Sequence, residues 1–153
     1  MNLYNLHISP ESLLLFKEAD EYVLDVFFRK YRDEPEELRK REKAISVEAY
    51  YAFYYAQDVL KRPFPAGEAV IASDAYYAYY YARDVLKGPF SLGEATIAKS
   101  AKYAFYYAQD VLKRPFPAGE AAITESAPYA YLYAAHVLKC SATDINAAFS
   151  TNP

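Results

Sequence analysis

The sequence predicts an all-α protein, a short α-solenoid of helix–turn–helix repeats with a helical cap at its N-terminus. Two observations lead to this fold class. A motif of about 26 residues recurs four times along the chain. Each copy carries small or apolar residues at helical spacing, followed in the first three copies by a turn that contains proline. Stacked copies can bury apolar faces that one pair of short helices cannot, so we expect a single compact domain.

The four copies follow a cap at residues 1–48, and they occupy residues 49–74, 75–100, 101–126 and 127–153. The first copy reads AYYAFYYAQDVLKRPFPAGEAVIASD, and the next two differ from it at few positions. The fourth begins APYAYLYAAHVLK and then diverges, but it keeps the register, because Phe149 aligns with Ile123. We expect this degenerate copy to close the C-terminal end of the stack.

The cap is expected to contain two helices. Glu11–Tyr31 reads as a long amphipathic helix that Ser9 and Pro10 open. Residues 36–46 resemble a charged version of the short second helix of each repeat, because Ile45 aligns with Ile71. Both helices would cover the first repeat.

The first segment of each repeat is an amphipathic helix, which in the first copy runs from Ala49 to Lys61. Its predicted buried stripe consists of residues 49, 52, 53, 56, 59 and 60. Asp74, Ser100 and Ser126 stand at the N-cap positions of the later copies, where a side-chain oxygen can accept a bond from a free backbone amide. The segment Lys61-Arg62-Pro63 is expected to end the helix, because proline cannot continue it.

The second segment is a short helix, Pro65–Ala72 in the first copy, that a proline and an acidic residue open. Phe64 in the turn is expected to fill the joint between the two helices. Glu68 fits a first-turn acid that interacts with the helix dipole. In the fourth copy, Ser141 or Thr143 can start a final helix over residues 144–149.

Composition and charge disfavour several classes of function. The formal net charge is −3 and the pI is near 5.4, whereas a nucleic-acid-binding domain is normally basic. The single Cys140 excludes an intramolecular disulfide and favours a reducing, cytoplasmic compartment. The N-terminal residues lack the features of a signal peptide, and charged or amide side chains interrupt every apolar stretch before it reaches the length of a membrane span.

The sequence offers no catalytic residue, cofactor site or metal site. Its glycines are isolated, so no phosphate-binding loop is present, and Glu68 recurs once per repeat, whereas an active site needs a unique constellation. His136 and Cys140 stand four residues apart on the last long helix. Two ligands are too few for a metal site, and no orienting third group suggests nucleophilic catalysis.

When the four copies are aligned, equivalent positions form columns, and these columns leave two interpretations of the many tyrosines. Tyr51 and Tyr55, with their equivalents, are expected to pack between repeats with their hydroxyl groups at the edge. Tyr54 and its equivalents, on the face opposite the stripe, either pack in the same way or form an exposed ridge for a protein partner. Lysine is constant at position 61 and its equivalents, and Asp58 can pair with Lys61 on the helix surface. The candidate partner-binding residues are Tyr50, Tyr54, Lys61, Tyr76, Tyr80, Arg83, Lys87, Tyr106 and Lys113.

The pattern Tyr51-Ala52-x-x-Tyr55-Ala56-x-x-Val59-Leu60-Lys61, followed by Pro-Phe and Gly-Glu-Ala, resembles short helical repeats of uncharacterised proteins from tailed bacteriophages and some bacteria. The resemblance covers residues 44–139 and leaves out the N-terminal cap. It implies a non-enzymatic module that binds a host protein, in its most specific form a phage-type inhibitor of a host defence complex such as CRISPR–Cas, acting in the host cytoplasm.

Two other functions stay open. The first is sequestration of a nucleotide or small molecule, which requires a concave pocket with aromatic rings and converging basic residues. The second is self-assembly, in which Ala147, Ala148 and Phe149 continue the stack into another copy of the chain.

Overall fold

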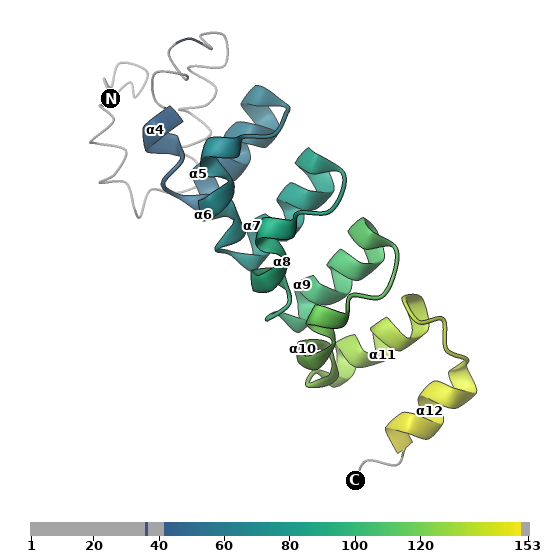
Figure 1. Ribbon diagram of the computed structural model, residues 1–153. Coiled ribbons are helices and arrows are strands. Elements are labelled where there is room, and N and C mark those ends of the chain that lie inside the picture. Colours follow the sequence, from purple (N-terminus) through teal and green to yellow (C-terminus); the bar gives the residue numbers. More distant parts are fainter. Residues whose placement is uncertain (1–35, 37–41, 151–153) are drawn as a thin grey trace, which may run out of the picture. The chain divides into compact units, whose positions relative to one another are not determined.

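The computed structural model describes residue 36 and residues 42–150 of the chain. All regular secondary structure in these residues is helical, and none of them lies in a strand, so the predicted all-α class is confirmed for this part of the chain (Figure 1). The helix expected over Glu11–Tyr31 lies outside the described residues, as do most of the expected cap and the last residues of the fourth copy. The chain forms two compact units, Met1–Val70 and Ile71–Pro153.

The first unit contains the end of the expected cap and most of the first repeat. Its described elements are helix α4 (Glu42–Ile45), helix α5 (Ala49–Tyr54), the π-helix η2 (Tyr55–Leu60) and the 3₁₀-helix η3 (Pro65–Gly67). Ile45 is buried, as its alignment with Ile71 predicts. Helix η3 packs against both α4 and α5. Helix α6 (Glu68–Ala72) begins at the end of this unit.

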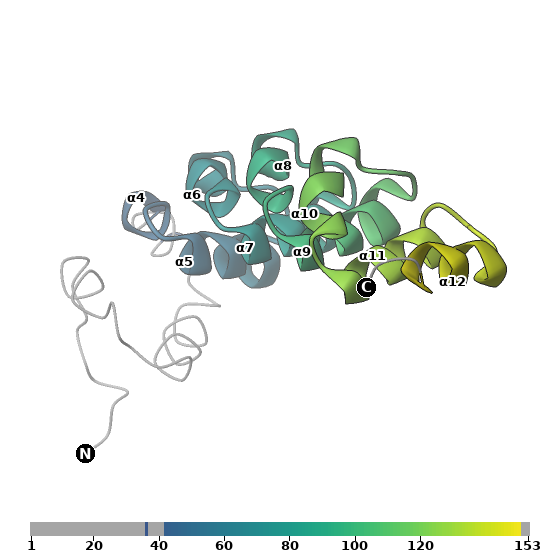
Figure 2. The ribbon, with the colours of Figure 1, turned by 90° about the horizontal axis from the view of Figure 1, so that it is seen from below.

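The second unit contains the other three repeats. The second repeat consists of α7 (Ala75–Tyr80), η4 (Tyr81–Leu86) and α8 (Ser91–Ile97), and the third of α9 (Ala101–Tyr106), η5 (Tyr107–Leu112), η6 (Pro117–Gly119) and α10 (Glu120–Thr124). The fourth consists of α11 (Ala127–His136) and α12 (Ala142–Ser150). Helix α9 packs between α7 and α11, and α8 and α10 form a second layer against them (Figure 2).

The starts of the first helices follow the predicted caps only in part. The Asp74 carboxylate accepts bonds from the Tyr76 and Tyr77 amides, at 2.8 and 3.2 Å, and Ser100 Oγ accepts one from the Tyr103 amide at 3.5 Å. The prediction for Ser126 is wrong, because its side chain makes no capping bond. The first turn of that helix contains Pro128, which has no amide hydrogen to cap.

The first helices end where the turn with lysine and proline begins, as predicted, but their last turn is not α-helical. In the first three repeats the α-helix widens into a π-helix, which ends at a lysine in the left-handed conformation. The four lysines are Lys61, Lys87, Lys113 and Lys139, with φ between 52° and 61°. A left-handed residue other than glycine costs about 1–2 kcal/mol. The following amide closes the turn by donating to a carbonyl six residues earlier, as in Gly88 N to Ala82 O at 3.0 Å.

The π-helix also changes which residues are buried. Ala78 and Ala82 lie fully inside, but Val85 and Leu86 are only half-buried, contrary to the predicted stripe. A π-helix contains more residues per turn than an α-helix, so α-helical spacing no longer holds the later residues on one face. The last turn of each first helix is therefore a surface feature.

A phenylalanine fills the joint between the two helices of a repeat, as predicted, and a glycine allows the helices to approach closely. Phe64, Phe90 and Phe116 are all buried. A β-carbon added to Gly93 would lie 2.6 Å from Phe90 Cδ1 and 2.8 Å from Ala78 Cβ. Each such glycine thus allows the short helix to touch the first helix of its own repeat. The fourth repeat has Ile145 at the glycine position and Ala142 at the phenylalanine position.

Candidate protein-binding surface

The candidate tyrosines of the first helices are partly exposed, and the two rings of a pair on one helix are in tilted contact. The rings of Tyr50 and Tyr54 lie 4.6 Å apart in the first unit, and those of Tyr76 and Tyr80 lie 4.5 Å apart in the second. Tyr76 is the most open of these four, at 38% exposed. Both interpretations of these tyrosines thus apply in part, because the rings pack together and also keep surface accessible to a partner.

In the second unit these contacts extend from repeat to repeat. Tyr103 lies 6.0 Å from Tyr76, and Tyr129 lies 6.4 Å from Tyr106, measured between ring centroids. We call this surface the tyrosine ladder, and it consists of Tyr76, Tyr80, Tyr103, Tyr106 and Tyr129. Sequence reasoning missed Tyr103 and Tyr129, because it assigned their column, that of Tyr51, to packing. Both side chains are partly exposed.

A second tyrosine column is buried, as predicted, and its hydroxyl groups make specific bonds. Tyr107 donates to Glu94 Oε1 at 2.9 Å and accepts from the Phe90 amide at 2.9 Å. Tyr133 makes the equivalent bonds to Glu120 and to the Phe116 amide. Burial raises the pKa of the Tyr107 hydroxyl. The bond from the Phe90 amide lowers this pKa by a smaller amount, and the bond to Glu94 raises it further. The repeated glutamates are thus acceptors that join one repeat to the next.

The same bond in the first unit links the end of the cap to the first repeat. Tyr55 donates to Glu42 Oε1 at 2.8 Å. Glu42 stands where later repeats have Glu68, Glu94 and Glu120. The charged segment before the first repeat therefore provides the acceptor that a preceding repeat would provide.

Arg83 belongs to a polar cluster that joins the second repeat to the third. Its guanidinium group binds the Asp84 carboxylate through two contacts, of 2.6 and 2.8 Å, and its carbon lies 4.5 Å from the centre of the Tyr80 ring. It also donates to the Tyr79 hydroxyl at 3.2 Å, and that hydroxyl donates to Asp110 at 2.6 Å. Burial and then the bond to Asp110 raise the pKa of Tyr79, and the bond to Asp84 raises the pKa of Arg83.

The candidate lysines Lys61, Lys87 and Lys113 are exposed at the left-handed ends of their helices. The expected pairing of Asp58 with Lys61 is wrong, because the structure contains no ion pair between them. A left-handed residue does not continue the helix, so it is not one turn above the aspartate on the same face. Lys102, in contrast, lies beside the tyrosine ladder, with its Nζ 5.2 Å from the centre of the Tyr103 ring.

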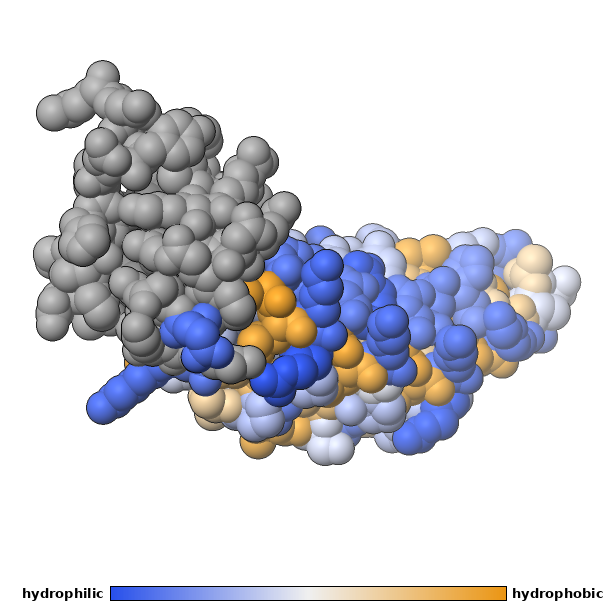
Figure 3. All heavy atoms as spheres, turned by 90° about the horizontal axis from the view of Figure 1, so that it is seen from above, coloured by the Kyte–Doolittle hydropathy of each residue, from blue (hydrophilic) through white to orange (hydrophobic). Residues whose placement is uncertain are grey.

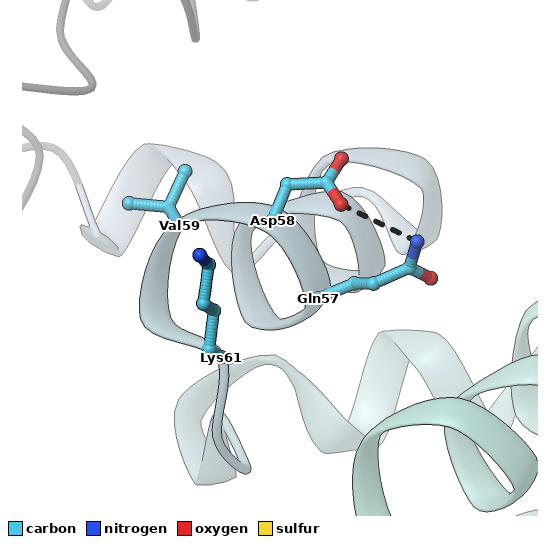
Figure 4. Close-up of a pocket in the computed structure, with 4 residues that line it drawn as sticks. All are labelled: Gln57, Asp58, Val59 and Lys61. Atoms are coloured by element: carbon cyan, nitrogen blue, oxygen red, sulfur yellow. Dashed lines mark hydrogen bonds between the residues drawn. The ribbon is translucent and has the colours of Figure 1, made fainter.

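A hollow beside η2 provides a comparison with the small-molecule alternative. Gln57, Asp58, Val59 and Lys61 line it, and Gln57 donates to Asp58 at 3.3 Å (Figure 4). Within this described lining there is one lysine and no aromatic ring. The hollow thus differs from the aromatic pocket with converging basic residues that a nucleotide-sequestering protein requires.

Other chemistry at the surface is sparse in the described part of the chain. His136 and Cys140 are both exposed, and no group of three or more histidine, cysteine, aspartate or glutamate side chains gathers there as metal ligands would. None of the described helices has the length and apolar character needed to cross a bilayer.

On the face of the described residues that Figure 3 shows, the surface is mainly hydrophilic, with smaller hydrophobic areas between the hydrophilic side chains. The large hydrophobic residues that are exposed in the described residues are scattered along the chain, and they are Val47, Tyr76, Leu92, Tyr131 and Leu138. No family model, curated protein or solved structure matches the chain.

Proposed function

We propose that this protein is a non-enzymatic binding module built as a short α-solenoid, and that the tyrosine ladder is where it binds a protein partner. The ladder carries this proposal. Rings from three successive repeats are in contact and partly exposed, beside Arg83 and Lys102. Tyrosine and arginine are enriched at interface hot spots, because they bring a large contact area together with hydrogen-bonding groups.

The solenoid part of the proposal rests on the packing within the second unit. Three first helices lie side by side there, and Tyr107 and Tyr133 make the same bonds to the repeat before each of them. Neighbouring helices pack about 8–10 Å apart, so each repeat adds a similar length of surface. A row of such repeats offers the extended surface that solenoid proteins use to bind other proteins.

The more specific proposal names the partner class from the resemblance to phage and bacterial repeats. In that proposal the protein acts in the host cytoplasm and inhibits a defence complex such as CRISPR–Cas. The mild net negative charge favours a protein surface of that complex over its nucleic acid.

The test is capture of a partner from bacterial lysates. The tagged full-length chain is incubated with lysates that do or do not express defence systems, and the bound proteins are identified by mass spectrometry. We expect one host defence protein in stoichiometric amount. Substitution of Tyr80 and Tyr106 together by alanine should abolish capture, while circular dichroism shows an unchanged helical content.

Leu92→Ala is the matched control, because Leu92 is 58% exposed but lies on α8, outside the ladder. It should capture the partner as the wild type does. Capture that survives the double tyrosine substitution would reject the ladder as the site. The absence of any captured protein would reject the inhibitor proposal.

One observation favours self-assembly as a second candidate. Tyr131 is 45% exposed, whereas its equivalents Phe53, Tyr79 and Phe105 are 2–3% exposed. Another copy of the chain would cover this face. The fourth repeat, however, has Asn146 in place of the acceptor glutamate. Light scattering over a range of concentrations separates the candidates, because self-assembly predicts a mass that grows with concentration and falls in Tyr131→Glu.

A further inference from the structure

A row of basic side chains follows the ends of the first helices in the second unit. We call it the basic edge, and it consists of Lys87, Lys113, Arg114 and Lys139. The three helices that precede these residues lie side by side and run in the same direction, so their last turns face the same side of the unit (Figure 1). All four side chains are exposed.

The aspartates nearest to this row in the sequence make no ion pair with it in the described residues. Asp84, three residues before Lys87, is held by Arg83 through two contacts. Asp110, three residues before Lys113, keeps its charge and accepts the Tyr79 hydroxyl. The fourth repeat has His136 instead of an aspartate at this position. No ion pair involves the basic edge within the described residues.

The backbone gives a second, independent observation. Each of the three lysines stands in the left-handed conformation, with φ of 53°, 53° and 61°. Glycine or asparagine adopts this conformation with less strain. A basic residue near a helix end interacts favourably with its free carbonyl groups, but a lysine inside the last turn would do so without strain. The lysine side chain itself is therefore the feature that the repeats retain.

We infer that the basic edge binds an acidic segment of a protein partner, with about one carboxylate facing each repeat. This inference rests on the proposed protein-binding function and gives its partner a chemistry. Charge complementarity supports it, because the edge is a regular row of exposed cations that make no ion pair within the described residues. The cations recur at the spacing of packed helices, about 8–10 Å. An acidic helix with a glutamate every seventh residue matches this spacing, since seven residues rise about 10 Å.

A protein segment fits the edge better than a nucleic acid. The chain has a net charge of −3, which repels a polyanion at long range. One or two cations per repeat are also too sparse to follow a phosphate backbone, which carries a charge at every nucleotide. A short acidic segment needs only local complementarity.

The test uses the full-length chain and a fluorescent helical peptide with glutamate at every seventh position. Fluorescence anisotropy at low ionic strength measures its dissociation constant. The double variant Lys87→Gly, Lys113→Gly should bind at least about tenfold more weakly, because it removes two attracting charges. Its thermal midpoint should stay equal or rise, since glycine relieves the left-handed strain. A change that weakens binding without destabilising the fold shows that the lysine side chains bind.

Two further variants make the result specific. Lys43→Gln with Lys99→Gln removes the same number of charges from exposed positions outside the basic edge, and should leave the affinity within about twofold. Lys87→Arg with Lys113→Arg keeps the charges and should also keep the affinity. Equal weakening in the control pair, no binding of the acidic peptide, or tighter binding of an oligothymidine of similar charge would each overturn the inference. Lysate capture that persists in the double glycine variant would reject the basic edge while leaving the proposed function intact.

Discussion

The third and fourth repeats share a register but differ in what packs against them. Phe105 in the third repeat is 3% exposed and contacts Tyr129 of the next first helix. Its equivalent in the fourth repeat, Tyr131, is 45% exposed. No further first helix follows the fourth repeat within the described residues. Burial of this column thus depends on the neighbouring repeat and not on the helix that carries it.

The turn and the short helix also differ between the third and fourth repeats. The third repeat has Phe116, Gly119 and Glu120, which fill the joint, allow the close approach and accept the hydroxyl of Tyr133. The fourth has Ala142, Ile145 and Asn146 at these positions. Of the three groups, Glu120 bonds to the following repeat, whereas Gly119 lies against Ala104 and Phe116 of its own repeat. The comparison teaches that the constant columns record contacts both within a repeat and between repeats.

The largest expected effect comes from removing the equivalent aromatic ring in the third repeat and in the fourth. Phe105→Ala should lower the free energy of unfolding by about 3–5 kcal/mol, because it leaves a cavity between two repeats. Tyr131→Ala should change it by less than about 1 kcal/mol, because the ring is half exposed. Urea denaturation followed by circular dichroism measures both. Equal losses would mean that the exposed end of the fourth repeat is covered in solution.

The second prediction concerns the glycines. Gly119→Ala should destabilise the protein by about 1–3 kcal/mol, because its β-carbon would lie 2.6 Å from that of Ala104 and force the helices apart. Gly88→Ala is the matched control, since its β-carbon would meet only the Leu86 carbonyl oxygen, at 3.9 Å. The control should be neutral or stabilise by up to about 1 kcal/mol. The same denaturation experiment would contradict the close approach if the two variants behaved alike.

The outcome of sequence reasoning follows from what a repeat pattern encodes. The spacing of alanines and the turns with proline predicted the helices of each repeat. The burial of Phe64 at the joint and of Tyr55 in the core was also predicted, because small and aromatic residues at helical spacing indicate a buried face. The left-handed lysines were missed, because no composition rule marks lysine for a positive φ. The π-helix was missed because periodicity over a few residues does not determine the number of residues per turn.

The candidate surface was predicted less completely for a related reason. The sequence identified Tyr76, Tyr80 and Tyr106, but it did not show that Tyr103 lies against Tyr76 across two repeats. The bond from Tyr107 to Glu94 spans 13 residues and was also missed. One signal in the sequence could have predicted this bond: each tyrosine of the Tyr107 column follows a glutamate by 13 residues. This pairing is detected only when the tyrosine and glutamate columns are compared with each other.

The third prediction tests that bond. Tyr107→Phe keeps the ring but removes the hydroxyl, so the buried Phe90 amide loses its acceptor. We expect a loss of about 1–3 kcal/mol in the free energy of unfolding, the usual cost of a buried unsatisfied group. Tyr129→Phe, in the fourth repeat, is the control and should be neutral, because the Tyr129 hydroxyl makes no hydrogen bond within the described residues. A neutral Tyr107→Phe would show that water replaces the hydroxyl.

The fourth prediction concerns alkaline pH. The pKa values of Tyr79, Tyr107 and Tyr133 are raised in the folded protein, with burial as the largest cause in each. The folded state therefore keeps these protons at a pH where the unfolded chain, with pKa values near 10, has lost them. Their contribution is complete below about pH 10 and falls above it, by about 1.4 kcal/mol per pH unit for each tyrosine. Denaturation from pH 8 to 11 measures the slope, which should be smaller in Tyr107→Phe. An unchanged slope would exclude Tyr107 as a source.

The smallest effect is expected where the second repeat differs from the third. Tyr79 stands in a column that has phenylalanine in the first and third repeats, and its hydroxyl donates to an aspartate of the next repeat. Tyr79→Phe should cost about 1 kcal/mol, because Asp110 is exposed and regains water. Combined with Arg83→Gln, it gives the second repeat the residues of the third at both positions. If the cluster acts as a unit, the two losses will not add in a double-mutant cycle. Additive losses would instead show that Tyr79 and Arg83 contribute separately, so that the second repeat joins the third mainly by the packing that every repeat shares.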